Sequence, residues 1–270
     1  MQNFSSKVNE IYSLEQFSSK DTVIHALHPM VKIAAAFFYI VCVVSFDRYA
    51  FIRLVPFIFY PVLIMALAEI PYSLILSRLL LALPFTMFAG LSNIFFDRAI
   101  LFYISGIGIS FGVVSFFTLI FRALLCVAAV LILVATTPFS SLTGQLRRMK
   151  IPEMFITLFE MTYRYIGSLL EETTIMITAY QLRRNADRGI DMKHMGSFVG
   201  QLLIRSFDRA QSVYDAMKCR GYGLFTRHMK KIGLNTPDYV FLVTACGLPL
   251  LLRFVDLSQF IQHWLTGALT

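Results

Sequence analysis

A polar region, residues 136–236, contains the segments ADRG (residues 186–189) and DAMKCRGY (residues 215–222), and apolar sequence flanks it on both sides. Fifteen of the chain's 24 Lys and Arg residues lie within residues 147–231, together with eight of its 16 Asp and Glu residues. This part of the chain therefore carries seven of the eight formal net positive charges. The whole chain is 57% hydrophobic and 15% charged, whereas soluble domains are about half apolar and a quarter charged. This composition predicts a polytopic membrane protein with a basic insertion.

Five apolar runs predict about five transmembrane helices in an all-α fold. They cover residues 30–46, 51–70, 79–96, about 111–135 and 239–255, and a polar turn is expected at residues 71–78. A helix rises about 1.5 Å per residue, so runs of this length cross most of a ~30 Å hydrocarbon core. Residues 100–111 contain Gly106 and Gly108 between β-branched residues, which is typical of an extended or looped excursion. We prefer this interpretation to a separate short span.

Two features inside the spans need partners from elsewhere. Pro56 and Pro61 interrupt the second apolar run, and membrane helices tolerate proline where neighbours satisfy the freed carbonyl groups. Arg122 lies near the middle of the fourth run, where an unpaired charge costs at least about 2.5 kcal/mol. We therefore expect Arg122 to face other protein, a partner subunit or the lipid head groups, and we favour a structural role over a role in transport.

Charge asymmetry predicts the organisation and orientation of the chain. We expect residues 1–29 to form a cytoplasmic N-terminal segment, 30–135 transmembrane helices 1–4, 136–236 a cytoplasmic region of long amphipathic helices, and 237–270 the last transmembrane helix and an external tail. Basic segments stay on the cytoplasmic side of membranes, and residues 256–270 contain no Lys or Arg. The acidic N-terminal residues and the lack of a short apolar core make a removable signal peptide unexpected.

Two long amphipathic helices are predicted within the polar region. The first begins at Pro152 and extends to Arg184, and the second covers about residues 199–217. Their apolar positions recur at helical spacing: Phe155, Leu158, Phe159, Thr162, Ile166, Leu169 and Leu170 in the first helix, and Val199, Leu203, Phe207, Ala210, Tyr214 and Met217 in the second. Both are therefore expected to present one apolar face.

Each predicted helix is followed by an Arg-Gly pair, Arg188-Gly189 and Arg220-Gly221. Glycine commonly ends a helix in the left-handed conformation, and a cation there complements the helix dipole. Taken singly, each pair is a structural cap. Two such caps, 32 residues apart, predict paired docking points at which a guanidinium meets a carboxylate of a soluble partner. The alternative is that the apolar stripes lie on an anionic membrane surface.

These segments resemble the signatures of a known family. DAMKCRGY (residues 215–222) resembles the second Ala-Arg-Gly-type signature of the transmembrane T component of energy-coupling factor (ECF) transporters, and ADRG (residues 186–189) lies where the first would be. HPMVK (residues 28–32) and YRY (residues 163–165) are also similar to that family. The chain departs from the pattern at Asp187 and Cys219, where the family has Ala. The residues carried over as ATPase-coupling sites are Ala186, Asp187, Arg188, Gly189, Cys219, Arg220 and Gly221.

The resemblance implies a function as well as a fold. T components of the cobalt-uptake (CbiQ) type are multi-pass proteins of the prokaryotic cell membrane. Their coupling helices bind two ABC-type ATPase subunits and also hold a membrane-embedded substrate-binding subunit. The implied function is therefore the coupling of ATP hydrolysis to cobalt ion uptake, with nickel or a vitamin as the alternative cargo.

The sequence lacks the motifs that would indicate ATP hydrolysis or metal-dependent hydrolysis. No phosphate-binding loop of the type Gly-x-x-x-x-Gly-Lys-Ser/Thr and no His-Glu-x-x-His motif occurs, so we expect no catalytic, cofactor or metal site and no enzyme activity. His25 and His28 are an incomplete metal-ligand set. The basic charge follows one side of a membrane, which argues against nucleic-acid binding. A membrane-embedded enzyme, for which Glu171-Glu172 is the one acidic pair, and a non-transport scaffold remain the alternatives.

Overall fold

The computed structural model describes residues 22–96, 100–104, 107–149, 151–184, 190–222, 233 and 235–254. The chain divides into two compact units, one containing residues 1–13 and 146–232 and the other residues 14–145 and 233–270. The elements, in chain order, are α2 (Val23–Ala26), α3 (Pro29–Val44), α4 (Phe51–Leu54), η1 (Val55–Ile58), α5 (Phe59–Leu67), α6 (Tyr72–Phe96), β1 (Ile100–Ile104), β2 (Ile107–Ser110), α7 (Phe111–Thr136), α8 (Phe139–Arg148), α9 (Glu153–Arg184), α10 (Met192–Cys219) and α11 (Thr236–Phe254).

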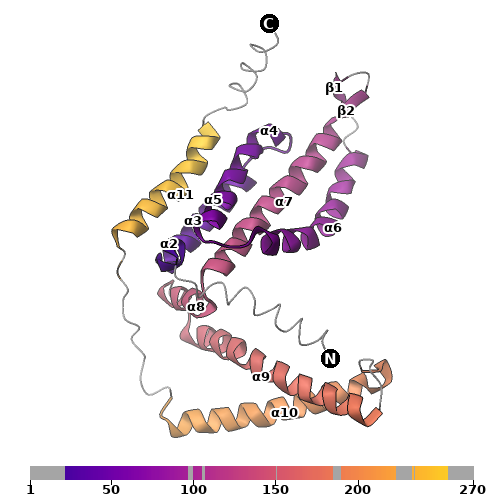
Figure 1. The fold of residues 1–270 in the computed structure, drawn as a ribbon, viewed down its shortest axis with the longest axis vertical. Coiled ribbons are helices and arrows are strands. Elements are labelled where there is room, and N and C mark those ends of the chain that lie inside the picture. The colour runs from indigo at the N-terminus through magenta and orange to yellow at the C-terminus, as the bar shows by residue number, and fades with distance from the viewer. Residues whose placement is uncertain are drawn as a thin grey trace. The chain divides into compact units, whose positions relative to one another are not determined.

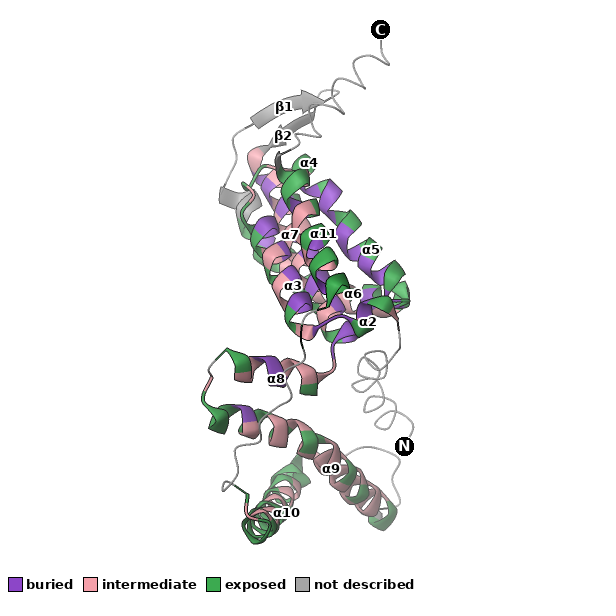
Figure 2. Ribbon diagram, turned by 90° about the vertical axis from the view of Figure 1, so that its left-hand side faces the viewer, coloured by how far each residue is buried: buried purple, intermediate pink, exposed green. Residues whose placement is uncertain are grey.

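The apolar unit is a helical bundle arranged around α7. Helices α6, α3, α4 and α5 all pack on α7, and α11 packs on α3 (Figure 1). Its interior includes the fully buried side chains of Tyr39, Val43, Leu54 and Phe57. In Figure 2 the buried residues of this unit lie along α3, α5 and α7. The predicted all-α membrane fold is thus confirmed for the described residues, with the short β1–β2 pair as its one departure.

The contact between α6 and α7 depends on one glycine. Gly90 is buried in α6, and a Cβ atom at this position would lie 2.8 Å from Cδ2 of Phe116 in α7. Carbon atoms do not approach so closely, so a larger residue here would require the Phe116 ring or the helices themselves to shift. A small residue at a helix contact lets two membrane helices pack tightly.

The broken second span shows how the bundle accommodates proline. The predicted single helix over residues 51–70 is divided into α4, the 3₁₀ turn η1 and α5. Pro61 has no N–H to donate to the carbonyl of Phe57 one turn earlier. The hydroxyl of Tyr39 in α3 donates to that carbonyl at 2.9 Å instead. The expected compensation by a neighbouring helix is therefore present.

Arg122 also finds its partners within the bundle. Its Nη2 atom donates to the carbonyl oxygens of Phe46 and Asp47, which follow the end of α3. These carbonyls lie at a helix C-terminus, where backbone acceptors lack intrahelical donors and the helix dipole is negative. The expectation that Arg122 faces other protein is confirmed, and its partners are carbonyl groups.

In the middle of the chain, one predicted turn is absent and one predicted extended segment is present. The polar turn expected at residues 71–78 is wrong, because α6 begins at Tyr72. Pro71 precedes the helix and its carbonyl accepts the N–H of Leu74 at 3.1 Å, so these polar residues form the first turns. The extended excursion expected at residues 100–111 is confirmed. β1 pairs with β2 in antiparallel register, with Phe102 opposite Ile109 and Tyr103 opposite Gly108.

Among the described residues, two helices are long and apolar enough to cross a bilayer by length and composition: α7, over its whole length, and residues 72–92 of α6. Helix α3 and residues 51–67 are shorter apolar helices. Helix α11 has 19 residues and includes Asp238 and Arg253. The count of five spans stays a prediction.

Candidate coupling surface

Both amphipathic helices predicted in the polar region are present. Helix α9 contains 32 residues and α10 contains 28. α9 begins directly after Pro152, and Glu153 in its first turn complements the positive end of the helix dipole. Within α9, Thr162 and Thr173 donate their hydroxyl groups to the carbonyl oxygens four residues earlier, so these polar side chains do not compete with the helix.

Helices α9 and α10 meet through polar side chains. The Tyr180 hydroxyl of α9 lies 3.1 Å from Nδ1 of His194 in α10. Further along, Nη1 of Arg205 in α10 forms an ion pair with Oε1 of Glu172 in α9. The residue order on the two helices is reversed, which makes the contact antiparallel. Both pairs are exposed, so each contributes little to stability, about 0–1 kcal/mol.

Helix α10 ends in a complete glycine-based cap. The N–H of Tyr222 donates to the carbonyl of Met217, and the N–H of Gly221 donates to the carbonyl of Lys218, both at 3.0 Å. Gly221 has φ 68°, the left-handed conformation that glycine adopts without strain. This hydrogen-bond pattern is the Schellman motif. It gives the residues at the end of α10 a defined geometry.

The cap presents Arg220 to solvent. Arg220 is the last residue before Gly221, its backbone has φ −89° and ψ 8°, and its side chain is exposed. No described residue forms an ion pair with its guanidinium. Cys219, which precedes it, is exposed as a free thiol. Arg220 is therefore a cation fixed at a rigid helix end and available to an external carboxylate.

An uncovered apolar stripe leads along α10 towards this cap. The residues of the stripe are Val199, Leu203, Phe207 and Tyr214, with exposed fractions of 53%, 54%, 65% and 57%. Helix α10 buries none of its residues within the chain, as its exposed surface in Figure 2 shows. Amphipathic helices obtain most of their stability from packing of the apolar face. We call these four residues and Arg220 the α10 surface.

The first predicted docking point, Ala186, Asp187, Arg188 and Gly189, lies outside the described residues. Of the seven predicted coupling residues, the structure therefore places Cys219, Arg220 and Gly221. They are adjacent on the chain at one helix end.

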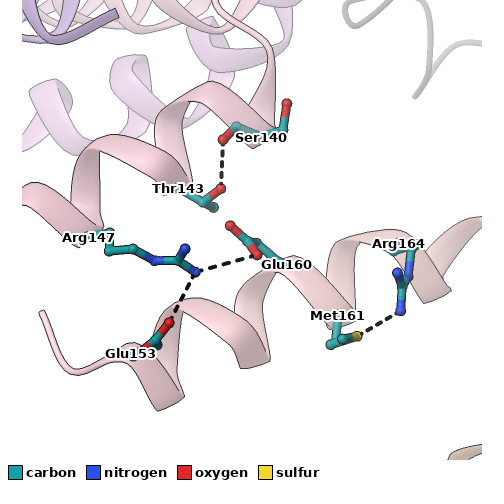
Figure 3. A network of polar contacts seen from close by, with 7 residues as sticks. All are labelled: Ser140, Thr143, Arg147, Glu153, Glu160, Met161 and Arg164. Atoms are coloured by element: carbon teal, nitrogen blue, oxygen red, sulfur yellow. Dashed lines mark hydrogen bonds and ion pairs between the residues drawn. The ribbon is translucent and has the colours of Figure 1, made fainter. Parts of the chain in front are cut away.

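The junction between α8 and α9 contains a charge cluster that the sequence did not indicate. Nη2 of Arg147, near the end of α8, lies 3.9 Å from Oε1 of Glu153 and 4.0 Å from Oε2 of Glu160 (Figure 3). The two carboxylates are seven residues apart, so they share one face of α9. A single guanidinium thus bridges two turns of α9. Helix α8 itself was not predicted.

A buried capping cluster in the apolar unit was also missed. Asp238 accepts the N–H of His28 at 2.7 Å and that of Asn235 at 2.8 Å. These are the N-cap residue of α3 and the residue that precedes α11. The Lys32 ammonium donates to the carbonyl of Thr136, the last residue of α7, at 2.9 Å. The Lys32–Thr136 contact joins residues 104 positions apart and the His28–Asp238 contact joins residues 210 positions apart, and no local pattern signals such contacts. We call His28, Lys32, Thr136 and Asp238 the capping cluster.

The two histidines considered as metal ligands have structural roles. Nδ1 of His28 accepts the N–H of Met30 at 3.1 Å and so caps α3, and Nδ1 of His25 lies 2.7 Å from the hydroxyl of Thr22. No group of three or more His, Cys, Asp or Glu side chains that could hold a metal ion occurs among the described residues.

Comparison with known proteins finds relatives that match this chain over part of its length and relatives that match it over most of its length. An uncharacterized protein of Methanocaldococcus jannaschii is 26% identical over 147 residues, 54% of this chain and 50% of that protein. The energy-coupling factor transporter transmembrane protein EcfT of Limosilactobacillus fermentum is 24% identical over 231 residues, 76% of this chain and 82% of that protein. The cobalt transport protein CbiQ of Rhodobacter capsulatus is 32% identical over 91 residues, 33% of this chain and 37% of that protein. The matches thus span half or less of the first and third relatives.

The apolar bundle and the basic amphipathic pair define a helical membrane protein with a long polar insertion. Residues 20–232 match the CbiQ family, described as Cobalt transport protein, and the chain belongs to this family. The predicted resemblance of the chain to ECF transporter T components of the CbiQ type is thereby confirmed.

Proposed function

We propose that this chain is the transmembrane coupling subunit of an ECF-type importer whose cargo is the cobalt ion. Two ABC-type ATPase subunits bind α9 and α10 from the cytoplasm, and a separate membrane-embedded subunit binds the substrate. The chain transmits the movement of the ATPases and catalyses no reaction itself. It lies in the cell membrane of a prokaryote, with its N-terminus and residues 136–236 in the cytoplasm.

The α10 surface is the observation that carries this proposal. Among the described residues its apolar stripe has no covering partner, and its Arg220 lies exposed at a glycine-capped helix end. Burial of exposed apolar area drives association, at roughly 25 cal/mol per Å², and a guanidinium opposite a carboxylate adds direction through paired hydrogen bonds. A helix of 28 residues is about 42 Å long at about 1.5 Å per residue. A displacement of one end of α10 can therefore be transmitted over a long distance to its other end.

The cargo and the second docking point rest on family membership. The CbiQ family carries the description Cobalt transport protein, and this supports cobalt over nickel or a vitamin. Arg188 and Gly189 take the same role in the proposal as Arg220 and Gly221. Cobalt itself is bound by the separate substrate-binding subunit, so this chain alone neither binds nor moves Co²⁺.

The docking test is the reversal of both charges in the assembled transporter. The double substitution Arg188→Glu, Arg220→Glu places carboxylates opposite the partner's carboxylates, and loss of one member of a buried charged pair costs about 3–5 kcal/mol. We expect the ATPase subunits to be lost on affinity purification of the chain and ATP-dependent uptake to fall to background.

Arg209→Glu is the matched control, because Arg209 lies on α10, is exposed, and is off the apolar stripe. It should leave assembly and uptake unchanged. Normal assembly and transport by the double variant would show that the two Arg-Gly pairs are structural caps only. A chain that never co-purifies with ATPase subunits would favour a scaffold or an enzyme.

The cargo is tested with the reconstituted assembly in vesicles. We expect ATP-dependent accumulation of radiolabelled Co²⁺ when the chain, the ATPases and the substrate-binding subunit are all present, and none when any one is omitted. Accumulation of a vitamin, but of neither Co²⁺ nor Ni²⁺, would overturn the cobalt assignment while leaving the coupling role in place.

A further inference from the structure

A depression of about 630 Å³ lies where α3 gives way to α4 in the apolar unit. Its lining consists of Asp47, Arg48, Tyr49, Ala50 and Arg53. Two guanidinium groups and one carboxylate thus surround an open hollow. Neither the proposed coupling role nor the cobalt cargo uses these residues.

Ring contacts place this depression along the first turns of α7. The Tyr49 ring lies 5.0 Å from that of Phe111, the first residue of α7, and the Phe51 ring lies 5.4 Å from that of Phe121. Helix α7 has 26 residues and is about 39 Å long at about 1.5 Å per residue, which exceeds the ~30 Å hydrocarbon core. Its first residues therefore lie at the depth of lipid head groups.

Positive charge gathers around this loop. Arg122 binds the carbonyl oxygens of Phe46 and Asp47 and so fixes the loop to α7. The Arg253 guanidinium lies 5.7 Å from the centre of the Phe46 ring. Arg48 is exposed and forms no ion pair with a described residue. Among the described residues that line the depression, two are basic and one, Asp47, is acidic, so this lining favours an anion.

Exposed apolar side chains continue from the rim of the depression. Ile52, Val55 and Phe59 have exposed fractions of 58%, 44% and 70%. Their spacing of three and four residues places them on one face of the α4–α5 segment. Acyl chains can cover such an apolar face, whereas a free anion or an acidic side chain of a protein makes no apolar contact with it.

We propose that this depression binds the phosphate group of a phospholipid, with the acyl chains of that lipid lying over Ile52, Val55 and Phe59. The planar guanidinium of Arg48 matches phosphate oxygens with paired hydrogen bonds. Arg53, which also lines the depression, supplies a second positive charge beside the phosphate. Tyr49 is of the type enriched at the head-group level.

The test measures lipid retention by the full-length chain. The protein, purified in mild detergent, is titrated with phosphatidylglycerol or with the phosphate-free lipid monogalactosyldiacylglycerol, and bound lipid is counted by native mass spectrometry. We expect Arg48→Gln, Arg53→Gln to weaken phosphatidylglycerol binding at least about tenfold, since the loss of even one charge-assisted hydrogen bond has about this effect, and to leave binding of the phosphate-free lipid unchanged. Arg48→Lys, Arg53→Lys keeps the charge without the guanidinium geometry and should give an intermediate result.

Arg183→Gln, Arg209→Gln is the control, since it removes the same charge from exposed positions in the other compact unit. Equal loss of lipid in the control, or equal retention of lipid by the Arg48, Arg53 variant, overturns the site. Displacement of phosphatidylglycerol by millimolar inorganic phosphate would assign the depression to a free anion. Loss of a co-purifying membrane subunit with normal lipid retention would assign it to a protein. Melting followed by circular dichroism shows that each variant is folded.

Discussion

The hydroxyl group of Tyr39 donates to the carbonyl of Phe57, which lacks a helical N–H donor at Pro61, and its removal tests how much this compensation contributes. We expect Tyr39→Phe to lower the free energy of unfolding by about 1–3 kcal/mol, because the carbonyl of Phe57 is left without this buried donor. The aromatic ring and its packing are kept. Denaturant unfolding of the purified protein in detergent, followed by circular dichroism, measures the change.

Tyr60→Phe is the matched control for this prediction. The Tyr60 ring stacks on that of Tyr39 at 4.2 Å and is also buried, but no described residue forms a hydrogen bond with its hydroxyl. The control should change stability by less than Tyr39→Phe. Equal effects of the two substitutions would mean that loss of a polar atom, and not the carbonyl freed by Pro61, explains the result.

Lys32 is the central cation of the capping cluster, and the residue is buried, with 5% of its surface exposed. Lys32→Met retains the length of the side chain but removes the donors to the carbonyls of His25 and Thr136. Hydrogen bonds to charged groups contribute about 1.5–3 kcal/mol each, so we expect a loss of at least about 1.5 kcal/mol in detergent unfolding. Unchanged stability would mean that solvent replaces Lys32 at these carbonyls.

A double-mutant cycle separates the two charges of the capping cluster. Asp238→Asn retains an acceptor for the N–H of His28 but removes the negative charge. If the carboxylate and the ammonium stabilise each other, the double variant Lys32→Met, Asp238→Asn should lose less stability than the sum of the single losses. Strict additivity would show that Asp238 acts only as a helix cap.

At the scale of the element, replacing a glycine of α10 by alanine should destabilise or stabilise the helix, depending on which glycine is replaced. Gly221→Ala forces a side chain into the left-handed conformation at φ 68°, which costs about 1–2 kcal/mol. We expect the last turn of α10 to loosen, with faster amide exchange at Gly221 and Tyr222 and weaker binding of the ATPase subunits, although Arg220 is unchanged.

Gly196→Ala on the same helix is the control with the opposite sign. A Cβ at Gly196 meets no atom within 4 Å, and alanine stabilises a helix interior by about 0.5–1 kcal/mol relative to glycine. It should raise the helicity of α10 and leave its end intact. Equal loss of ATPase binding in both variants would mean that α10 must bend, so that the cap is not the feature that matters.

The long periodic elements could be predicted from sequence and the short ones could not. Helices α7, α9 and α10 each carry their apolar residues over many turns. The bounds of α7 and α9 lie within one residue of the predicted ones, whereas α10 begins at Met192, before the predicted start near residue 199, and ends at Cys219. Helix α2 has four residues and α8 has ten, too few to establish a period. The break of the second span into α4, η1 and α5 depends on where Tyr39 lies in another helix, which local sequence does not contain.

The candidate site divides in the same way. The cap at Gly221 and the exposure of Arg220 follow from a local signal, an Arg-Gly pair after an amphipathic helix. The depth of Arg122 within an apolar run indicated that it needs a partner. The sequence does not indicate that its partners are backbone carbonyl groups at the end of α3. The capping cluster joins residues from three distant helix ends, so neither its members nor its geometry could be read from spacing.

At the scale of the whole molecule, the charge asymmetry predicts five spans with the N-terminus inside and the C-terminus outside. We expect a membrane-impermeant thiol reagent added from outside to label a cysteine introduced at Ser258 and not one at Ser6. The experiment uses a variant in which Cys42, Cys126, Cys219 and Cys246 are replaced by serine or alanine. Labelling of both positions, or of neither, would show an even number of spans.

The exposed apolar stripe of α10 affects how fast unassembled copies of the protein are degraded in the cell. A newly made chain without partners leaves Val199, Leu203, Phe207 and Tyr214 exposed, and exposed apolar clusters promote association and aggregation. Quality-control proteases remove such unassembled subunits, since turnover follows the population of exposed states. The abundance of the chain should therefore follow the supply of its partners, so that surplus copies are degraded and the assembly keeps fixed proportions without matched synthesis.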